Sequence, residues 1–220
     1  MSTLTVYPNP GVTTDGPVLR SATEADWSVL IAGAGTTAWP NTDIDRVIQI
    51  AGGATTNKFT INGKSIFLFD ASALTSSAII SAAVMSIRGD TKADILAATP
   101  NVDIYTSTPA SDTTLVAADY SQVGSTSQTG SPITYANWTA SAYNDFTFDA
   151  TGRSNISKTG ISKFAARNAN YDVTGTPPAW AEGTSRLNGY FSDAIGTTKD
   201  PKLVITYTLP AVLSGFFMMM

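Results

Sequence analysis

The chain has 220 residues, a formal net charge of −4, and neither cysteine nor histidine. No disulfide, thiolate metal site or cysteine nucleophile can form, and a catalytic centre built on a histidine base is excluded. The acidic balance and the lack of any Lys/Arg run argue against a nucleic-acid partner. Because 43% of the residues are hydrophobic, the chain can bury a sizeable core.

The N-terminal residues, MSTLTVYPNPG, have neither the basic nor the apolar stretch of a signal peptide. We therefore expect the protein to fold in the compartment where it is made. The longest apolar runs, residues 77–87 and the C-terminal segment, are well below the ~20 residues that a membrane-spanning helix needs. We expect no membrane span.

Short segments rich in β-branched and aromatic residues follow one another along the chain, which is typical of strands. In chain order they cover residues 3–7, 28–35, 46–52, 65–72, 79–89, 102–107, 144–151, 161–167, 186–192 and 202–208. Within one of them, Ile66 and Leu68 alternate with Phe67 and Phe69, so the two pairs should face opposite sides of the sheet.

Clusters of Gly, Pro, Asn, Asp, Ser and Thr separate these segments, and only residues 151–160 could form a turn of helix. Some ten short strands with polar connections predict an all-β fold, a two-sheet antiparallel jelly-roll β-sandwich. We expect one domain over residues 1–208, followed by a short apolar C-terminal segment at 209–220.

Two stretches resemble a known group of proteins. SIFLFDASALTSSAIISAAVMSIRGD (65–90) resembles DNRLRE-type, carbohydrate-binding-module-like jelly rolls. The stretch from Asn144 to Thr208, which closes with DPKLVITY, is similar to a module of bacteriophage, environmental viral and bacterial surface proteins. The resemblance implies a jelly-roll scaffold for glycan binding or virion display. Independently of it, we expect Asp70 to accept backbone N–H groups in an Asx turn, and Pro201 to begin the last strand.

Carboxylates are the remaining candidates for catalysis or metal binding. Asp145 and Asp149 fall on one face of a predicted strand, a spacing that does not forbid a glycosidase pair, although turn and strand-end roles are the simpler interpretation. Asp43 and Asp45 form a D-x-D that could hold a structural calcium ion. We expect no other cofactor and no enzymatic activity.

Five aromatic residues are candidates for stacking on sugars. Trp39, Trp138, Trp180 and Tyr171 fall in polar loops, and Tyr190 falls on a predicted strand. Exposed rings in loops are a common means of ligand binding. The alternative for each is a ring that folds back to cap an end of the sandwich.

The C-terminal segment contains Phe216, Phe217, Met218, Met219 and Met220. Left in water, these side chains would form an exposed apolar patch. We expect the segment to anchor the protein to other virion proteins or to copies of itself, and the alternative is that it folds back on its own sandwich.

These observations together favour a non-enzymatic virion structural protein: a capsid decoration, head-fibre or tail-associated jelly roll with glycan binding as an accessory activity. It would be assembled in the host cytoplasm and displayed on the virion surface. The alternative is a stand-alone carbohydrate-binding or adhesion module, extracellular or at the cell surface.

Overall fold

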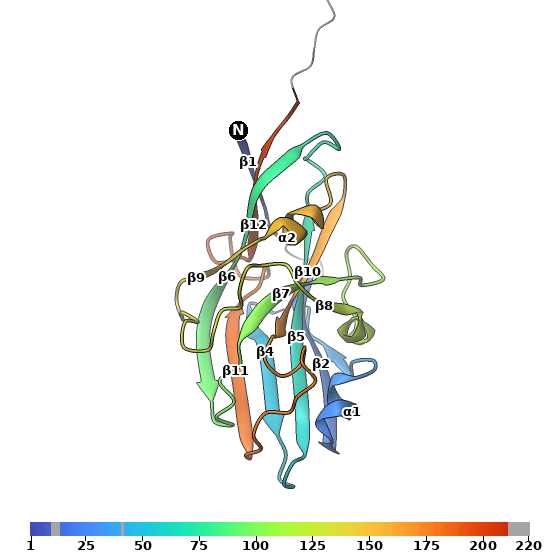
Figure 1. Ribbon diagram of the computed structural model, residues 1–220, viewed down its shortest axis with the longest axis vertical. Helices are drawn as coiled ribbons and strands as arrows, with labels where there is room; N and C mark the ends of the chain where they lie inside the picture. Colours follow the sequence, from blue (N-terminus) through green and yellow to red (C-terminus); the bar gives the residue numbers. More distant parts are fainter. Residues whose placement is uncertain (10–13, 41, 211–220) are drawn as a thin grey trace, which may run out of the picture.

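The computed structural model describes residues 1–9, 14–40 and 42–210. These residues form twelve strands, two α-helices of five residues each and one 3₁₀ helix (Figure 1). The strands are β1 Ser2–Val6, β2 Asp15–Ala25, β3 Thr37–Ala38, β4 Ile44–Gly52, β5 Phe59–Asp70, β6 Ile79–Asp94, β7 Val102–Ser107, β8 Val123–Ser127, β9 Tyr143–Thr147, β10 Ile161–Asn168, β11 Gly183–Tyr190 and β12 Lys202–Thr208. The helices are α1 Trp27–Ile31, η1 Ala117–Gln122 and α2 Ala150–Ser154. The predicted all-β fold class is confirmed.

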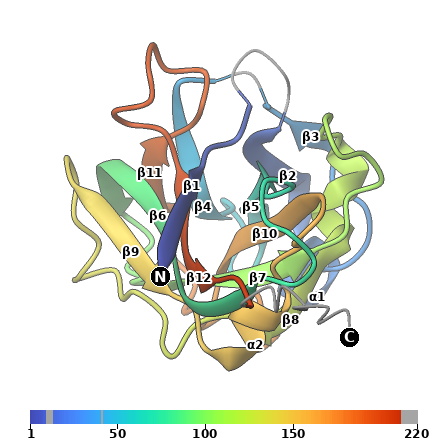
Figure 2. The same cartoon turned by 90° about the horizontal axis from the view of Figure 1, so that it is seen from above.

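The long strand β6 joins the two layers of the sandwich. Its first part pairs with β12 on one edge and with β9 on the other, and its last residues pair with β11. Every pairing between the named strands is antiparallel, and the layers form one continuous hydrogen-bonded sheet. Seen from above, β6 and β9 lie on one side of the molecule and β2 and β3 on the other (Figure 2).

Strand β5 is the centre of the larger layer. One edge of β5 pairs with β2, while its other edge pairs with β4 over Phe59–Gly63 and with β10 over Ser65–Asp70. The predicted alternation within β5 is confirmed, because Phe67 and Phe69 belong to the main core whereas Ile66 and Leu68 belong to a separate cluster. Tyr120 of η1 belongs to that second cluster, so both faces of this strand are buried.

The main core fills the space between the layers. It draws residues from both, for example Met85 and Ile205 from the smaller layer and Phe164 from the larger one. The rings of Phe67 and Phe191 stack at a centroid distance of 5.7 Å. A third cluster lies under α1, where Trp27 meets Phe59 edge-on at 5.2 Å.

The segment between β5 and β6 connects the two layers. Its small residues Ala71 and Ala78 and the side chain of Leu74 are buried in the main core. Asp70 accepts the backbone N–H of Ser72 at 2.9 Å. Hydrogen bonds from the side chain and the backbone of Ser72 hold the pKa of the Asp70 carboxyl below the ordinary value. The predicted Asx turn is confirmed, as is the position of Pro201 directly before β12.

Some predictions of local structure are wrong. Residues 28–35, predicted as a strand, instead contribute to α1, which begins after Asp26 and buries Trp27 and Leu30. Residues 15–25 form the eleven-residue strand β2, which the polar sequence DGPVLRSATEA gave no reason to expect. The helical turn expected within 151–160 is confirmed as α2.

The predicted anchor residues Phe216, Phe217, Met218, Met219 and Met220 lie outside the described residues. In residues 1–9, 14–40 and 42–210 every helix is too short to span a bilayer.

Candidate functional site

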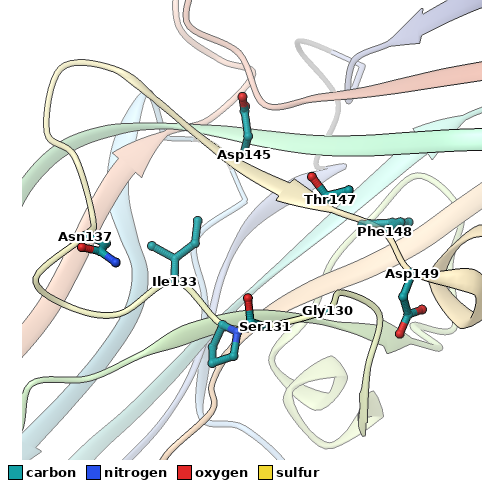
Figure 3. Close-up of a pocket in the computed structure, with 9 residues that line it drawn as sticks. Gly130, Ser131, Ile133, Asn137, Asp145, Thr147, Phe148 and Asp149 are labelled. Carbon is teal, nitrogen blue, oxygen red and sulfur yellow. The ribbon is translucent and has the colours of Figure 1, made fainter.

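An open cavity of about 450 Å³ lies beside strand β9 (Figure 3). We call it the β9 cavity. One wall is β9 and the residues that follow it, and the other is the loop between β8 and β9. It is lined by Gly130, Ser131, Pro132, Ile133, Asn137, Asp145, Thr147, Phe148 and Asp149.

The alternation of β9 supplies the polar wall of the β9 cavity. Asn144 and Phe146 are buried, so Asp145 and Thr147, which alternate with them, are directed to the surface. The facing loop is held by backbone hydrogen bonds, since Ile133 exchanges two with Val102 at 2.8 and 2.9 Å. The polar side chains are therefore carried by a fixed frame.

The two carboxylates of the β9 cavity have different roles. Asp149 caps α2, where its Oδ1 accepts the backbone N–H of Gly152 at 2.8 Å. Asp145 is exposed on the strand, and Figure 3 shows the two carboxylates pointing to opposite sides. The expectation that they share a strand face is wrong because β9 ends at Thr147, so its alternation does not reach Asp149.

The β9 cavity is suited to hydrogen bonding. Asp145 offers acceptor oxygens, Asn137 offers both an amide donor and an acceptor, and Ser131 and Thr147 offer hydroxyls. All four residues are exposed. Pro132 and the half-buried Ile133 add apolar surface between them. This combination fits a hydroxyl-rich ligand with apolar patches, such as a sugar.

Trp138 is not an exposed ring. Only 2% of its surface is accessible, and it belongs to the main core between the layers. Its candidacy as a stacking platform is therefore wrong. The loop folds back because burying a large aromatic side chain is favourable, and Trp138 takes the capping role that was the stated alternative.

Tyr171 and Trp180 are half-buried and pack against the cluster under α1. The hydroxyl of Tyr171 donates to the carbonyl oxygen of Ala98 at 2.8 Å. Both side chains thus support the loop that carries them.

Trp39 is the most exposed of the five candidates, with 40% of its surface accessible. The guanidinium of Arg46 lies 4.6 Å from the centre of its ring. Tyr190 is half-buried, with the Nζ of Lys199 at 4.5 Å from its ring centre. Each of these rings already has a cation beside it.

A second cavity, of about 300 Å³, borders the loop that carries Tyr171 and Trp180. It is lined by Asp26, Trp27, Ser28, Asn57, Phe59, Gly175, Pro177 and Pro178. Sequence reasoning missed Trp27 because residues 28–35 were assigned to a strand, and it missed Phe59 because the predicted strand began only at residue 65. The two rings are only 3% and 2% accessible, so they form a floor that offers no free ring face.

Asp43 and Asp45 do not act as a pair. Asp45 accepts the backbone N–H of Arg46 at 2.7 Å and lies 3.3 Å from its guanidinium. Asp43 is exposed, and its carbonyl oxygen accepts the N–H of Phe191 at 2.9 Å. Among the described residues, no group of three or more metal-binding side chains is gathered at one place.

A buried acidic group escaped sequence reasoning altogether. Asp15 is fully buried and accepts two hydrogen bonds from Ser192, from its hydroxyl at 2.6 Å and its N–H at 3.0 Å. Burial raises the pKa of Asp15 to about 7, and the charges of Asp193 and Asp200 add to this. Burial likewise raises the pKa of Asp200 to about 6.

A buried cluster of charges lies on the outer face of the larger layer. The carboxylate of Asp172 accepts two hydrogen bonds from Arg167, at 2.8 and 3.0 Å, and lies 3.4 Å from the Nζ of Lys64. Burial lowers the pKa of Lys64 to about 8. Its ammonium also lies 4.0 Å from the ring centre of Tyr120.

No protein-family model matches the chain, and no curated protein gives a significant match.

Proposed function

We propose that this chain is a non-catalytic structural protein of a bacteriophage particle that binds glycans in the β9 cavity. It would be assembled in the host cytoplasm and displayed on the virion surface, with other virion proteins or further copies of itself as partners. The resemblance of residues 144–208 to a module of bacteriophage, environmental viral and bacterial surface proteins supports a place in a virus particle. The four exposed hydrogen-bonding side chains of the β9 cavity support the proposal that it binds a glycan.

The β9 cavity suits a glycan better than the second cavity does. Its carboxylate, amide and hydroxyl groups are exposed on a strand and a loop, whereas the rings of the second cavity are buried. Sugars present many hydroxyls at close spacing, so such groups on a fixed frame fit them. The orientation of Asp149 away from Asp145 supports binding without hydrolysis, because a glycosidase needs two carboxyls about the same bond.

The proposed glycan binding is tested by screening the purified protein on a glycan array and measuring the affinity of any glycan that binds by calorimetry. Asp145→Asn and Asn137→Ala should each weaken binding about fivefold or more, since one hydrogen bond to a charged or polar group contributes ~1–3 kcal/mol. Glu182→Gln removes an exposed carboxylate elsewhere and should leave the affinity unchanged. If both cavity variants bind the glycan with unchanged affinity, the β9 cavity is not the glycan site.

The proposed place of the chain in a virus particle is tested by mass spectrometry of purified bacteriophage particles. These particles should contain the chain. A stand-alone carbohydrate-binding or adhesion module could use the same cavity, but it would be found outside particles. Particles without the chain would therefore favour that alternative, whatever the array shows.

A further inference from the structure

The sequence contains a single Asp-Pro peptide bond, between Asp200 and Pro201 at the entry to β12. Both residues are buried, and only 1% of the surface of Asp200 is accessible. An aspartate carboxyl group can reach the carbon of its own main-chain carbonyl, because the ring that forms has five members. The nitrogen of proline belongs to a tertiary amide, which accepts a proton more readily than an ordinary peptide nitrogen does. This peptide bond is therefore the one most open to attack by its own side chain.

The carboxyl group of Asp200 has an oxygen atom that the described residues leave without a hydrogen-bond partner. This atom, Oδ1, is buried, and an unpaired buried acceptor lowers stability. Burial and the charge of Asp193 raise the pKa of Asp200 to about 6. Asp15 is a further acid close enough to interact with the charge of Asp200. In mildly acidic solution Asp200 is thus a neutral acid that has a proton to give and an oxygen free to attack.

The lysines on either side of Asp200 do not pair with it. The Nζ of Lys199 lies 4.5 Å from the ring centre of Tyr190. The Nζ of Lys202 lies 4.1 Å from the ring centre of Tyr143. Among the ion pairs formed by residues 1–9, 14–40 and 42–210, none involves Asp200. Without a paired cation to favour the carboxylate, the neutral form of Asp200 persists to higher pH.

A hydrogen-bond donor lies at the carbonyl group of the same peptide bond. The hydroxyl of Tyr143 on β9 donates to the main-chain oxygen of Asp200 at 3.0 Å and is shared with that of Thr198 at 3.1 Å. Burial raises the pKa of Tyr143, and Tyr7 and Asp200 raise it further. The charge of Arg88, the partner of Tyr143 in the sheet, acts in the opposite direction. Such a donor stabilises the negative charge that develops on a carbonyl oxygen when its carbon is attacked.

We propose that the bond between Asp200 and Pro201 is a self-cleavage site of the folded protein. An oxygen of the Asp200 carboxyl group bonds to the carbon of its own main-chain carbonyl, the carboxyl proton passes to the nitrogen of Pro201, and the carbon–nitrogen bond breaks. The cyclic anhydride that results adds one water molecule and becomes a C-terminal aspartic acid. The reaction thus consumes one water molecule, and Tyr143 acts as its catalytic hydrogen-bond donor.

Cleavage would leave β12 in the sheet, because both of its neighbours hold it. Strand β12 pairs with β1 over Leu203–Tyr207 and with β6 over Lys202–Thr208. The product would be a nicked protein that elutes as one species in size-exclusion chromatography and separates into residues 1–200 and 201–220 under denaturing conditions. This inference does not depend on the glycan proposal.

The test is to incubate the full chain at about pH 5 and about pH 8 and to follow its intact mass. At the lower pH we expect two fragments, 1–200 and 201–220, whose masses sum to that of the intact chain plus one water. At the higher pH the rate should fall about tenfold or more, because the Asp200 carboxyl is then ionised. The same chain unfolded in urea at the lower pH should cleave about tenfold more slowly, because it lacks the buried acid and the Tyr143 donor.

Variants assign the roles of the two side chains. Asp200→Asn should abolish the acid-dependent cleavage, whereas Asp145→Asn, an exposed acid on β9, should cleave at the unmodified rate. Tyr143→Phe should slow cleavage of the folded chain about fivefold or more and leave the rate in urea unchanged. Equal rates for the folded and the urea-unfolded chain would overturn the proposal, and this comparison needs no variant to fold. Cleavage that persists in Asp200→Asn, or a folded chain that stays intact while the unfolded chain is cut, would overturn it as well.

Discussion

Three tryptophans of this chain sit in different surroundings although each lies in a polar stretch of sequence. Trp138 is in the main core, Trp27 is covered by the loop beyond Tyr171, and Trp39 keeps 40% of its surface accessible. The environment of each ring is set by residues far away in the chain. The main core that contains Trp138 also contains Met85 and Ile205 of the smaller layer.

The burial of Trp138 gives a direct stability prediction. Trp138→Ala should lower the free energy of unfolding by ~3–5 kcal/mol, because it removes a large ring and leaves a cavity. Trp138→Phe should cost much less, since the indole Nε1 has no hydrogen-bond partner among the described residues. Urea unfolding measures both. Trp39→Ala serves as the control, and a similar loss there would contradict the assignment.

The buried groups Asp15 and Lys64 predict how stability depends on pH. The raised pKa of Asp15 means that the folded state holds its proton more tightly, so the free energy of unfolding should fall as pH rises from about 4 to about 7. For Asp15 this amounts to about 4 kcal/mol, at ~1.4 kcal/mol per pKa unit. The lowered pKa of Lys64 has the opposite sign, so stability should recover between pH 8 and 10.5.

Asp15→Asn tests the acidic part of this profile. The variant cannot ionise, so the decline between pH 4 and 7 should become shallower, leaving mainly the part due to Asp200 below about pH 6. Urea unfolding at a series of pH values measures the slope. An unchanged slope in Asp15→Asn would assign the dependence to other groups.

At the scale of single elements, the start of α2 contains a residue, Asp149, that has two structural roles. Asp149 caps this five-residue helix and also borders the β9 cavity. Asp149→Ala should cost about 1 kcal/mol of stability through the lost cap, and Asp149→Ser, which keeps a capping oxygen, should restore most of it. Chemical denaturation measures the difference. If the two variants are equally destabilised, the capping hydrogen bond is not what stabilises α2.

The elements that could be predicted from sequence are those whose burial follows from the pattern of neighbouring residues. The alternation of residues 66–69 predicted which side chains lie on each face of β5. The position of Asp70 at the end of this strand predicted the Asx turn. Strand β2 was missed because Val18 and Leu19 are its only large apolar residues and its pairing with β5 cannot be read from the local sequence. The β9 cavity could not be predicted either, because Ser131 and Asp145 come to line one cavity only through the fold.

At the scale of the whole molecule, the shared strand β6 should make the two layers unfold together. Neither layer can separate without breaking the pairing of β6 with β11 or with β12. We therefore expect a single transition. Tryptophan fluorescence, which reports Trp138 and Trp27, should have the same midpoint as far-ultraviolet circular dichroism, which reports the strands. Two separated midpoints would show that the layers are independent.

The pairing of β1 with β12 has a consequence for synthesis. Ser2 is the partner of Tyr207, so β1 is synthesised long before the strand with which it pairs. At ~5–20 residues per second this delay is roughly 10–40 s. During that time Leu4 and Val6 have no sheet to join, and β1 is a free edge that other nascent chains could pair with. The sheet can therefore be completed only after β12 has been synthesised, and crowded polysomes should lower the yield of folded protein.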